Sequence, residues 1–232
     1  MKFKLAILSA VIALQSASAG IIFNVEAAGV QQTGFSGVLT ETFNLLPAGA
    51  LGAHTSVIGD YSTGGQISNP NAWGGSNQTN YIALGAQSNT TSYTIDFKRD
   101  LTYFGVYWAA GDGLNELRFY NNGALVQSFN TTTILSPLSS AYSGNPNNGQ
   151  NMGEKYAYVN FTTTQGSLFD QVMFYNYGTG TGFETDNHSI LGITPENTKP
   201  TAENPEPATL ALVGAATTVL AIARRRLRKC ES

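Results

Sequence analysis

Short runs of β-branched and aromatic residues, separated by clusters of Gly, Asn, Ser and Pro, recur through residues 20–195. Such runs are typical of strands and the clusters are typical of turns, because Gly, Asn and Pro suit the backbone angles of tight turns. Polar and apolar residues alternate at 93–97 and 156–161, as strands with one buried face require. The predicted strands are 21–25, 38–43, 81–84, 93–97, 103–108, 116–120, 124–129, 156–161, 172–177 and 189–193. The pattern predicts an all-β fold, a single jelly-roll-like β-sandwich.

The segment around Asn121, Asn122 and Gly123 is the clearest local signal. An Asn-Gly pair tolerates the positive φ angles of a two-residue turn, so a hairpin is predicted here. The stretches 59–80 and 136–153 read as long irregular loops, which in a compact domain tend to be functional or mobile. One helical turn is predicted at 131–135.

The amino terminus has the three parts of a secretory signal peptide. Lys2 and Lys4 form a short basic region, 5–14 is an apolar run, and a small-residue pattern ends at Ala19. Cleavage by signal peptidase is expected between Ala19 and Gly20, so that residues 1–19 are removed.

The carboxyl terminus has three parts of a different kind. Pro205, Glu206 and Pro207 form a stiff segment that disfavours helix. The apolar stretch 208–223 predicts a transmembrane helix, and the cluster after it orients that helix with its basic end in the cytoplasm. The cluster consists of Arg224, Arg225, Arg226, Arg228 and Lys229. Residues 196–204 read as a polar linker between the domain and this tail.

The order Pro-Glu-Pro, apolar helix and basic end over 205–229 resembles the PEP-CTERM sorting signal of bacterial proteins that exosortases process. This resemblance implies export and transient anchoring in the inner membrane. It further implies exosortase cleavage near Pro205–Pro207 and release to the cell surface or extracellular matrix. Bacteria with this system usually make exopolysaccharide, so an extracellular polysaccharide is an expected partner.

Residues 103–115, with Trp73 and Gly74 before them and 182–188 after them, resemble a group of exosortase-dependent surface proteins of cyanobacteria and proteobacteria. The segment from Asn145 to 156–161 fits the same pattern. The resemblance implies a secreted β-sandwich of undefined activity.

Removal of both ends would change the charge of the chain. Two of the twelve Lys and Arg residues lie in 1–19 and five lie beyond residue 204, where two of the fifteen acidic residues also lie. Thirteen acidic and five basic residues then remain, a net charge near −8. Such a surface disfavours nucleic acid as a partner. The single cysteine, Cys230, lies in the tail, so neither a disulfide nor a cysteine ligand is expected in the domain.

Oxygen ligands for a cation are available in two segments. Asp112 and Asn115 follow an aromatic strand, and Glu184 and Asp186 lie two residues apart, on one face if extended. Ca²⁺ takes six to eight oxygen ligands, so these four residues are candidate Ca²⁺ ligands; no other cofactor is expected. The alternative is that Asp112 and Asn115 only form Asx-turns.

Aromatic side chains suggest a carbohydrate-binding, lectin-like module as the alternative to a surface protein without such a site. Candidate platforms for sugar rings are Trp73, Trp108, Tyr61, Tyr142 and Tyr175. Trp108 is expected in the core, because aromatic residues dominate cores. Trp73, on a Gly-rich loop, is the candidate ligand-binding residue, with loop anchoring as its alternative role.

Catalysis has weaker support. Glycoside hydrolysis needs two carboxylates about 5–9 Å apart, and the sequence does not show whether any two of Asp112, Glu154, Glu184 and Asp186 converge. His54 and His188 are the two histidines, and a loop or capping role is expected for each. The expectation is therefore a non-enzymatic exported surface or matrix protein.

Overall fold

The computed structural model of the protein describes residues 20–192. The expected signal peptide (1–19), the linker (196–204) and the sorting tail (205–229) with its helix 208–223 lie outside the described residues. Within 20–192 the chain forms fourteen strands, one short α-helix and one 3-10 turn, so the prediction of an all-β protein is confirmed. No helix in this described part is long and apolar enough to cross a membrane.

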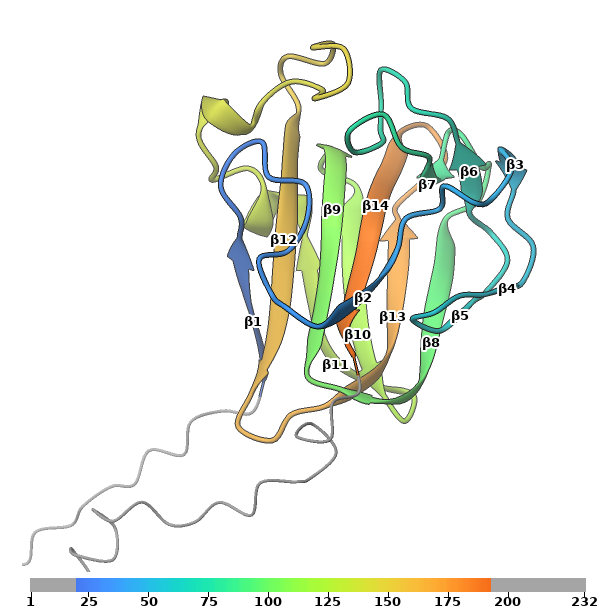
Figure 1. The fold of residues 1–232 in the computed structure, drawn as a ribbon, viewed down its shortest axis with the longest axis vertical. Helices are drawn as coiled ribbons and strands as arrows, with labels where there is room; N and C mark the ends of the chain where they lie inside the picture. Colours follow the sequence, from blue (N-terminus) through green and yellow to red (C-terminus); the bar gives the residue numbers. More distant parts are fainter. Residues whose placement is uncertain (1–19, 193–232) are drawn as a thin grey trace, which may run out of the picture. The chain divides into compact units, whose positions relative to one another are not determined.

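The strands form two antiparallel sheets (Figure 1). The large sheet has the order β1 (Gly20–Val25), β12 (Lys155–Thr164), β9 (Tyr103–Gly111), β14 (Gly182–Leu191), β7 (Tyr81–Gly85), β6 (Gln66–Ser68) and β3 (Gly49–Ala50), and β2 (Val38–Glu41) also pairs with β14. The small sheet has the order β11 (Ala124–Asn130), β10 (Asn115–Asn121), β13 (Phe169–Asn176), β8 (Ser92–Leu101), β5 (Asp60–Tyr61) and β4 (His54–Thr55). The helix α1 (Thr131–Ile134) and the 3-10 turn η1 (Ser140–Tyr142) lie between β11 and β12.

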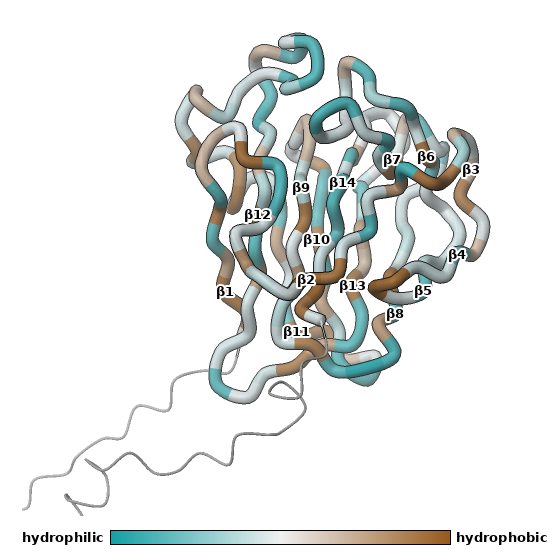
Figure 2. The backbone as a smooth tube through the Cα atoms, in the orientation of Figure 1, coloured by the Kyte–Doolittle hydropathy of each residue, from teal (hydrophilic) through white to brown (hydrophobic). Residues whose placement is uncertain are grey.

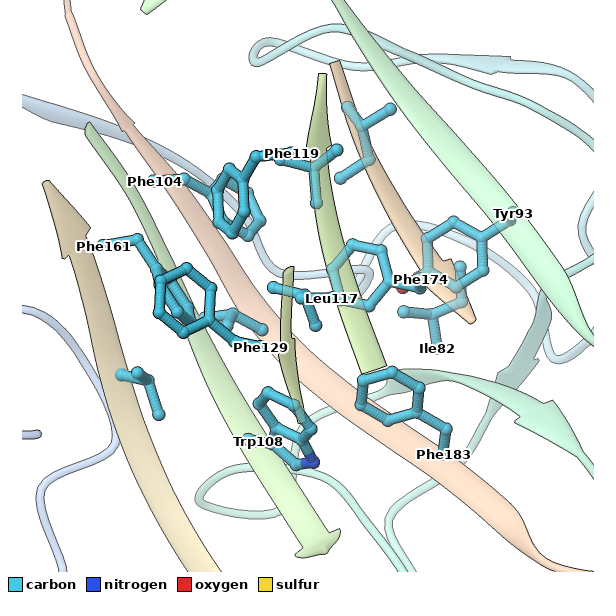
Figure 3. Packing of buried hydrophobic residues seen from close by; sticks show 14 of the residues in the cluster. Ile82, Tyr93, Phe104, Trp108, Leu117, Phe119, Phe129, Phe161, Phe174 and Phe183 are labelled. Carbon is cyan, nitrogen blue, oxygen red and sulfur yellow. The ribbon is translucent and has the colours of Figure 1, made fainter. Parts of the chain in front are cut away.

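The small sheet has the alternation that the sequence predicts. In β8 the buried residues Tyr93, Ile95 and Phe97 alternate with more exposed ones. Their side chains face the large sheet, where Phe104 of β9 lies 6.2 Å from Phe174 of β13 between ring centroids. Figure 3 shows these rings meeting in one core between the two sheets. Burial of large aromatic side chains therefore holds the sheets together.

The large sheet is buried on both faces, which the alternation argument does not predict. Eight consecutive residues of β9, from Tyr103 to Ala110, are buried. The inward ones join the main core, whereas Tyr107, Ala109, Tyr156 and Tyr158 belong to a second cluster on the outer face. Segments 26–37, 69–80 and 139–153 contribute contacts to that face; for example, Phe35 packs 4.8 Å from Tyr103. The long loops are thus a covering layer of the large sheet.

The hairpin prediction is confirmed. β10 and β11 are joined at Asn122 and Gly123, whose φ angles are 48° and 77°. Positive φ at both turn residues is the geometry that an Asn-Gly pair accommodates. The predicted helical turn at 131–135 is also present, as α1, and Asn130 caps it by accepting a hydrogen bond from the backbone N–H of Thr133.

Two parts of the strand prediction are wrong. The short strands β3 to β6 lie in segments that read as turns or loops, because two or three residues are too few to show a pattern. The last strand begins at Gly182 and not at Ser189. Its first half is polar (Figure 2), and a polar run resembles a loop unless its burial is known.

The two ends of the described domain lie together. Gly20 of β1 pairs with Thr164 at the end of β12, and β14 also ends at this side with Leu191. The opposite end carries the long loops, which are mostly hydrophilic (Figures 1 and 2). The ten residues of β12 connect the two ends, a span of about 30 Å.

Candidate functional site

The turn after β9 is built by the side chains of Asp112 and Asn115. Asp112 Oδ1 accepts from the backbone N–H of Leu114 at 2.8 Å, and Asn115 Oδ1 accepts from the N–H of Asp112 at 3.2 Å. The Asn115 amide is buried and donates to the carbonyl of Gly182 at 2.8 Å. Asn115 therefore ties this turn to the start of β14, whereas Asp112, which accepts from the residue two positions on, forms an Asx-turn.

Glu184 and Asp186 share the outer face of β14, but their surroundings differ. Asp186 accepts hydrogen bonds from the N–H of Ser76 at 2.9 Å, the hydroxyl of Thr79 at 2.6 Å and the N–H of Asn187 at 2.7 Å. Burial raises the pKa of Asp186 to about 6, and these hydrogen bonds oppose the rise. Asp186 thus anchors the turn at 76–79 to the large sheet.

Glu184 lies at a pocket instead. Its carboxylate accepts a hydrogen bond from the side-chain amide of Gln87. A cavity of about 440 Å³ opens beside it, at the end of the sheets opposite Gly20. The six side chains that contribute chemistry to it come from five segments of the chain. They are Trp73, Gln87, Asp112, Glu154, Thr181 and Glu184.

Two of the three carboxylates at this pocket, Glu154 and Glu184, have raised pKa values. Burial, and then the negative charge of Asp112, raises the pKa of Glu184 well above its ordinary value, with a smaller contribution from Glu154. Burial and the charge of Asp112 also raise the pKa of Glu154. An acidic group whose charged form is disfavoured by burial and by like charges is a common feature of functional sites.

Several polar atoms of the pocket are buried without a hydrogen-bond partner. They are Glu154 Oε2, Gln87 Oε1 and Thr181 Oγ1. Buried polar atoms are nearly always paired, so three such atoms beside one cavity call for a specific reason. A bound molecule with hydrogen-bond donors would supply one.

Trp73 stands at the pocket with half of its surface, 49%, exposed. Its loop is held by asparagine side chains of the neighbouring long loop. Asn147 Nδ2 donates to the carbonyls of Gly74 and Gly75 at 3.0 and 2.9 Å, and Asn145 Nδ2 donates to the carbonyl of Asn71 at 2.7 Å. The indole therefore projects from a braced loop.

The structure brings together three of the candidate metal- and ligand-binding residues named from the sequence: Trp73, Asp112 and Glu184. Glu154, considered there for hydrolysis, lines the same pocket, whereas Asn115 and Asp186 are engaged in the hydrogen bonds described above. Gln87 and Thr181 have no sequence signal, since an isolated Gln or Thr in a loop is ordinary. Gly20 starts β1, and the other predicted processing and membrane-orienting residues lie outside the described chain.

Three of the other aromatic and histidine candidates, Trp108, Tyr61 and His188, are buried in the core. Trp108 is fully buried, as expected, and Tyr61 is buried at 2% exposure, so Tyr61 is not a surface platform. His188 is also fully buried, which corrects the expectation of a loop or capping histidine. Over residues 20–192, no group of three or more His, Cys, Asp or Glu side chains is arranged to hold a metal ion.

No protein-family model matches the sequence, and no similar curated protein or similar solved structure was found.

Proposed function

We propose that this chain is a non-enzymatic surface or extracellular-matrix protein that is exported, processed by an exosortase and associated with exopolysaccharide or cell-surface organisation. The observation that carries the proposal is the order of segments in the sequence. A signal peptide at 1–19 precedes the β domain, and Pro205–Pro207, the apolar stretch 208–223 and a basic cluster follow it. Signal peptidase, exosortase and the inner membrane are the partners that this order implies.

The described domain supports this proposal in its layout. Its first strand begins and its last strand ends at one side, and the pocket lies at the other side. A domain tethered at its carboxyl end would thus present the pocket away from its tether. The net charge near −8 of residues 20–204 suits a soluble surface protein and disfavours nucleic acid.

The fold that we assign to the domain is a jelly-roll-like sandwich. β7, β14, β9 and β12 are neighbours in the large sheet, and β8, β13, β10 and β11 are neighbours in the small sheet. Consecutive strands from β7 to β14 alternate between the sheets, except for β10 and β11, which form a hairpin within the small sheet. This strand order is that of a jelly roll. Lectin domains are among the proteins that use this architecture.

The intact mass of the extracellular form tests the sorting proposal. A mass that corresponds to cleavage after Ala19 and near Pro205–Pro207 is expected. Deletion of 210–229, or replacement of Glu206, should leave an uncleaved or mislocalised product. Identical mass and fractionation of the wild-type and altered chains would contradict the proposal.

A second candidate function is a carbohydrate-binding, lectin-like module, and the pocket with Trp73 favours it. An aromatic face beside several hydrogen-bonding side chains is an arrangement suited to a sugar ring. A glycan array probed with and without EDTA tests this function and any requirement for Ca²⁺. The absence of glycan binding at high protein concentration would exclude it.

The same glycans test whether the protein is an enzyme. Because Asp112, Glu154 and Glu184 line one pocket, hydrolysis would be the chemistry to look for. We expect every bound glycan to be recovered intact, by mass, after prolonged incubation. A shortened product that disappears in a Glu184→Gln variant would make the protein a glycosidase.

A further inference from the structure

The charge of the pocket is not balanced by the protein. Residues 20–192 contain four Lys and Arg side chains, and each is engaged elsewhere. Lys98 pairs with Asp60, Arg118 pairs with Glu116 and Arg99 donates to the carbonyl of Leu191. Lys155, although next to Glu154 in sequence, donates to the carbonyls of Leu138 and Ser139 at 3.0 and 2.8 Å. Within the described chain, Asp112, Glu154 and Glu184 therefore face the pocket without a protein cation.

The unpartnered atoms indicate which groups would suit a ligand of this pocket. Glu154 Oε2 and Gln87 Oε1 are acceptors, and Gln87 uses its side-chain N–H on Glu184. An ammonium group has three donors and no acceptor, so it matches a set of acceptors and negative charges. A charge-assisted hydrogen bond is also stronger than a neutral one.

The indole and the volume of the pocket point to an organic ligand. Trp73 exposes an aromatic surface on which a sugar ring can stack, and a cation near such a surface gains further attraction. The cavity of about 440 Å³ lies within the range of small-molecule sites, roughly 300–1,000 Å³, and is far larger than a bare ion.

We infer that this pocket binds a protonated amino sugar, a saccharide unit with a free amine. Its ammonium group lies among Asp112, Glu154 and Glu184, and its ring lies against Trp73. This inference rests on the carbohydrate-binding function proposed above and specifies its ligand class. A polysaccharide that carries free amines is then the extracellular partner.

Two oligosaccharides that differ only in charge test the inference. The full-length chain, purified in detergent, is titrated calorimetrically with a glucosamine tetrasaccharide and with its fully N-acetylated counterpart, at a pH where the amine is protonated. We expect the free-amine form to bind at least about tenfold more tightly, since acetylation removes the charge that strengthens its hydrogen bonds.

Three variants assign this binding to the pocket. The double change Asp112→Asn with Glu154→Gln preserves shape and removes two charges, and it should abolish the preference for the free amine. Trp73→Ala should weaken both sugars. Asp100→Asn, which removes one charge from an exposed position of β8, should behave as the wild type. Circular dichroism of each variant establishes that it is folded.

Proton release gives a readout that a merely structural role would not produce. A bound ammonium lowers the raised pKa values of Glu154 and Glu184, so the sugar should displace protons from the protein. The measured binding enthalpy should then depend on the ionisation enthalpy of the buffer. This dependence should disappear with the N-acetylated sugar.

The remaining outcomes overturn the inference in distinct ways. Equal affinity for the two sugars would retain carbohydrate binding and reject the amine as its determinant. Binding of neither sugar would reject both the ligand class and the lectin function for this pocket. Binding of CaCl₂ alone, lost in the Asp112→Asn/Glu154→Gln variant, would make the site a metal site.

Discussion

His188 lies in the middle of the aromatic core and is uncharged there. Its Nδ1 is hydrogen-bonded to the Tyr61 hydroxyl and its Nε2 to the Thr185 hydroxyl, both at 2.9 Å. Thr185 is also hydrogen-bonded to the Tyr93 hydroxyl at 3.1 Å. The imidazole stacks on Phe174 with a centroid distance of 4.9 Å. Both ring nitrogens of this buried side chain have a partner, which is the condition under which a polar group is tolerated in a core.

The protonation of His188 should control stability in acid. Burial lowers the pKa of His188 from 6.5 to about 3, so the unfolded chain binds its proton first. Neutral His188 therefore costs no stability above pH 6.5. As pH falls from 6.5 towards 3, the free energy of unfolding decreases, by about 5 kcal/mol in total. Asp186 acts in the opposite sense, because its pKa in the folded state is raised to about 6 and its contribution is lost as pH rises through that value.

Urea unfolding of the wild type and of His188→Gln, measured from pH 3 to pH 8, checks this prediction. The variant should be less stable at neutral pH, and its stability should fall less on acidification. Parallel pH profiles for the two proteins would contradict the assignment of the acid transition to His188.

Gly85 is a residue whose replacement should be costly. Its φ angle is +76°, and a Cβ atom there would collide with the backbone carbonyl of Thr181. Gly85→Ala should lower the free energy of unfolding by more than about 1 kcal/mol. Gly113→Ala is the matched control, because no atom lies within 4 Å of the position that its Cβ would occupy, and it should change stability by less than about 0.5 kcal/mol.

At the scale of elements, β14 organises both faces of the large sheet through one bulge. Asp186 pairs with Tyr107 but Ser189 pairs with Gly105, so β14 has one extra residue at this point. Asn187, in the bulge, has a φ angle of 48°. The extra residue moves His188 and Ile190 to the core side, while Glu184 and Asp186 stay on the outer side. A bulge of this kind re-aims side chains without ending the strand.

The long loops at 69–80 and 139–153 are joined to each other by asparagine side chains. Asn147→Ala removes the hydrogen bonds to Gly74 and Gly75 and the one accepted from the N–H of Gln78. We expect amide hydrogen exchange to accelerate in 71–79 while the core strands stay protected, since local opening of this loop then has fewer contacts to break.

Asn148→Ala is the control for this exchange experiment. Asn148 accepts only a local hydrogen bond from the N–H of Gln150, so exchange in 71–79 should remain slow. Equal acceleration in both variants would mean that the attachment of 71–79 to the neighbouring loop does not depend on Asn147.

At the scale of the whole molecule, packing replaces covalent cross-links. The chain has a single cysteine, Cys230, so residues 20–192 contain no disulfide. The aromatic core and the second cluster outside the large sheet supply the burial that stabilises the fold. The melting temperature should therefore be the same with and without a reducing agent, as measured by differential scanning calorimetry. A fall under reducing conditions would show that a covalent contact contributes.

The sequence alone predicted the elements whose conformation depends on neighbouring residues. The alternation in β8 and the Asn122–Gly123 turn were predictable, because strand patterns and turn angles depend on neighbouring residues. Trp108 was assignable to the core from its aromatic surroundings. The signal peptide at 1–19 and the sorting tail at 205–229 stay predictions that rest on order and composition alone.

Only the tertiary structure decided the pocket, the buried histidine and the covered outer face. Trp73, Gln87, Asp112 and Glu184 come from separate segments, and their convergence depends on which strands pair and on asparagine contacts between loops. The polar start of β14 resembles a loop because its burial arises from segments far away in sequence, the turn at 76–79 over Asp186 and Gln87 over Glu184. Polarity is a property of the residue, whereas burial is a property of the fold, and the site of this protein depends on both.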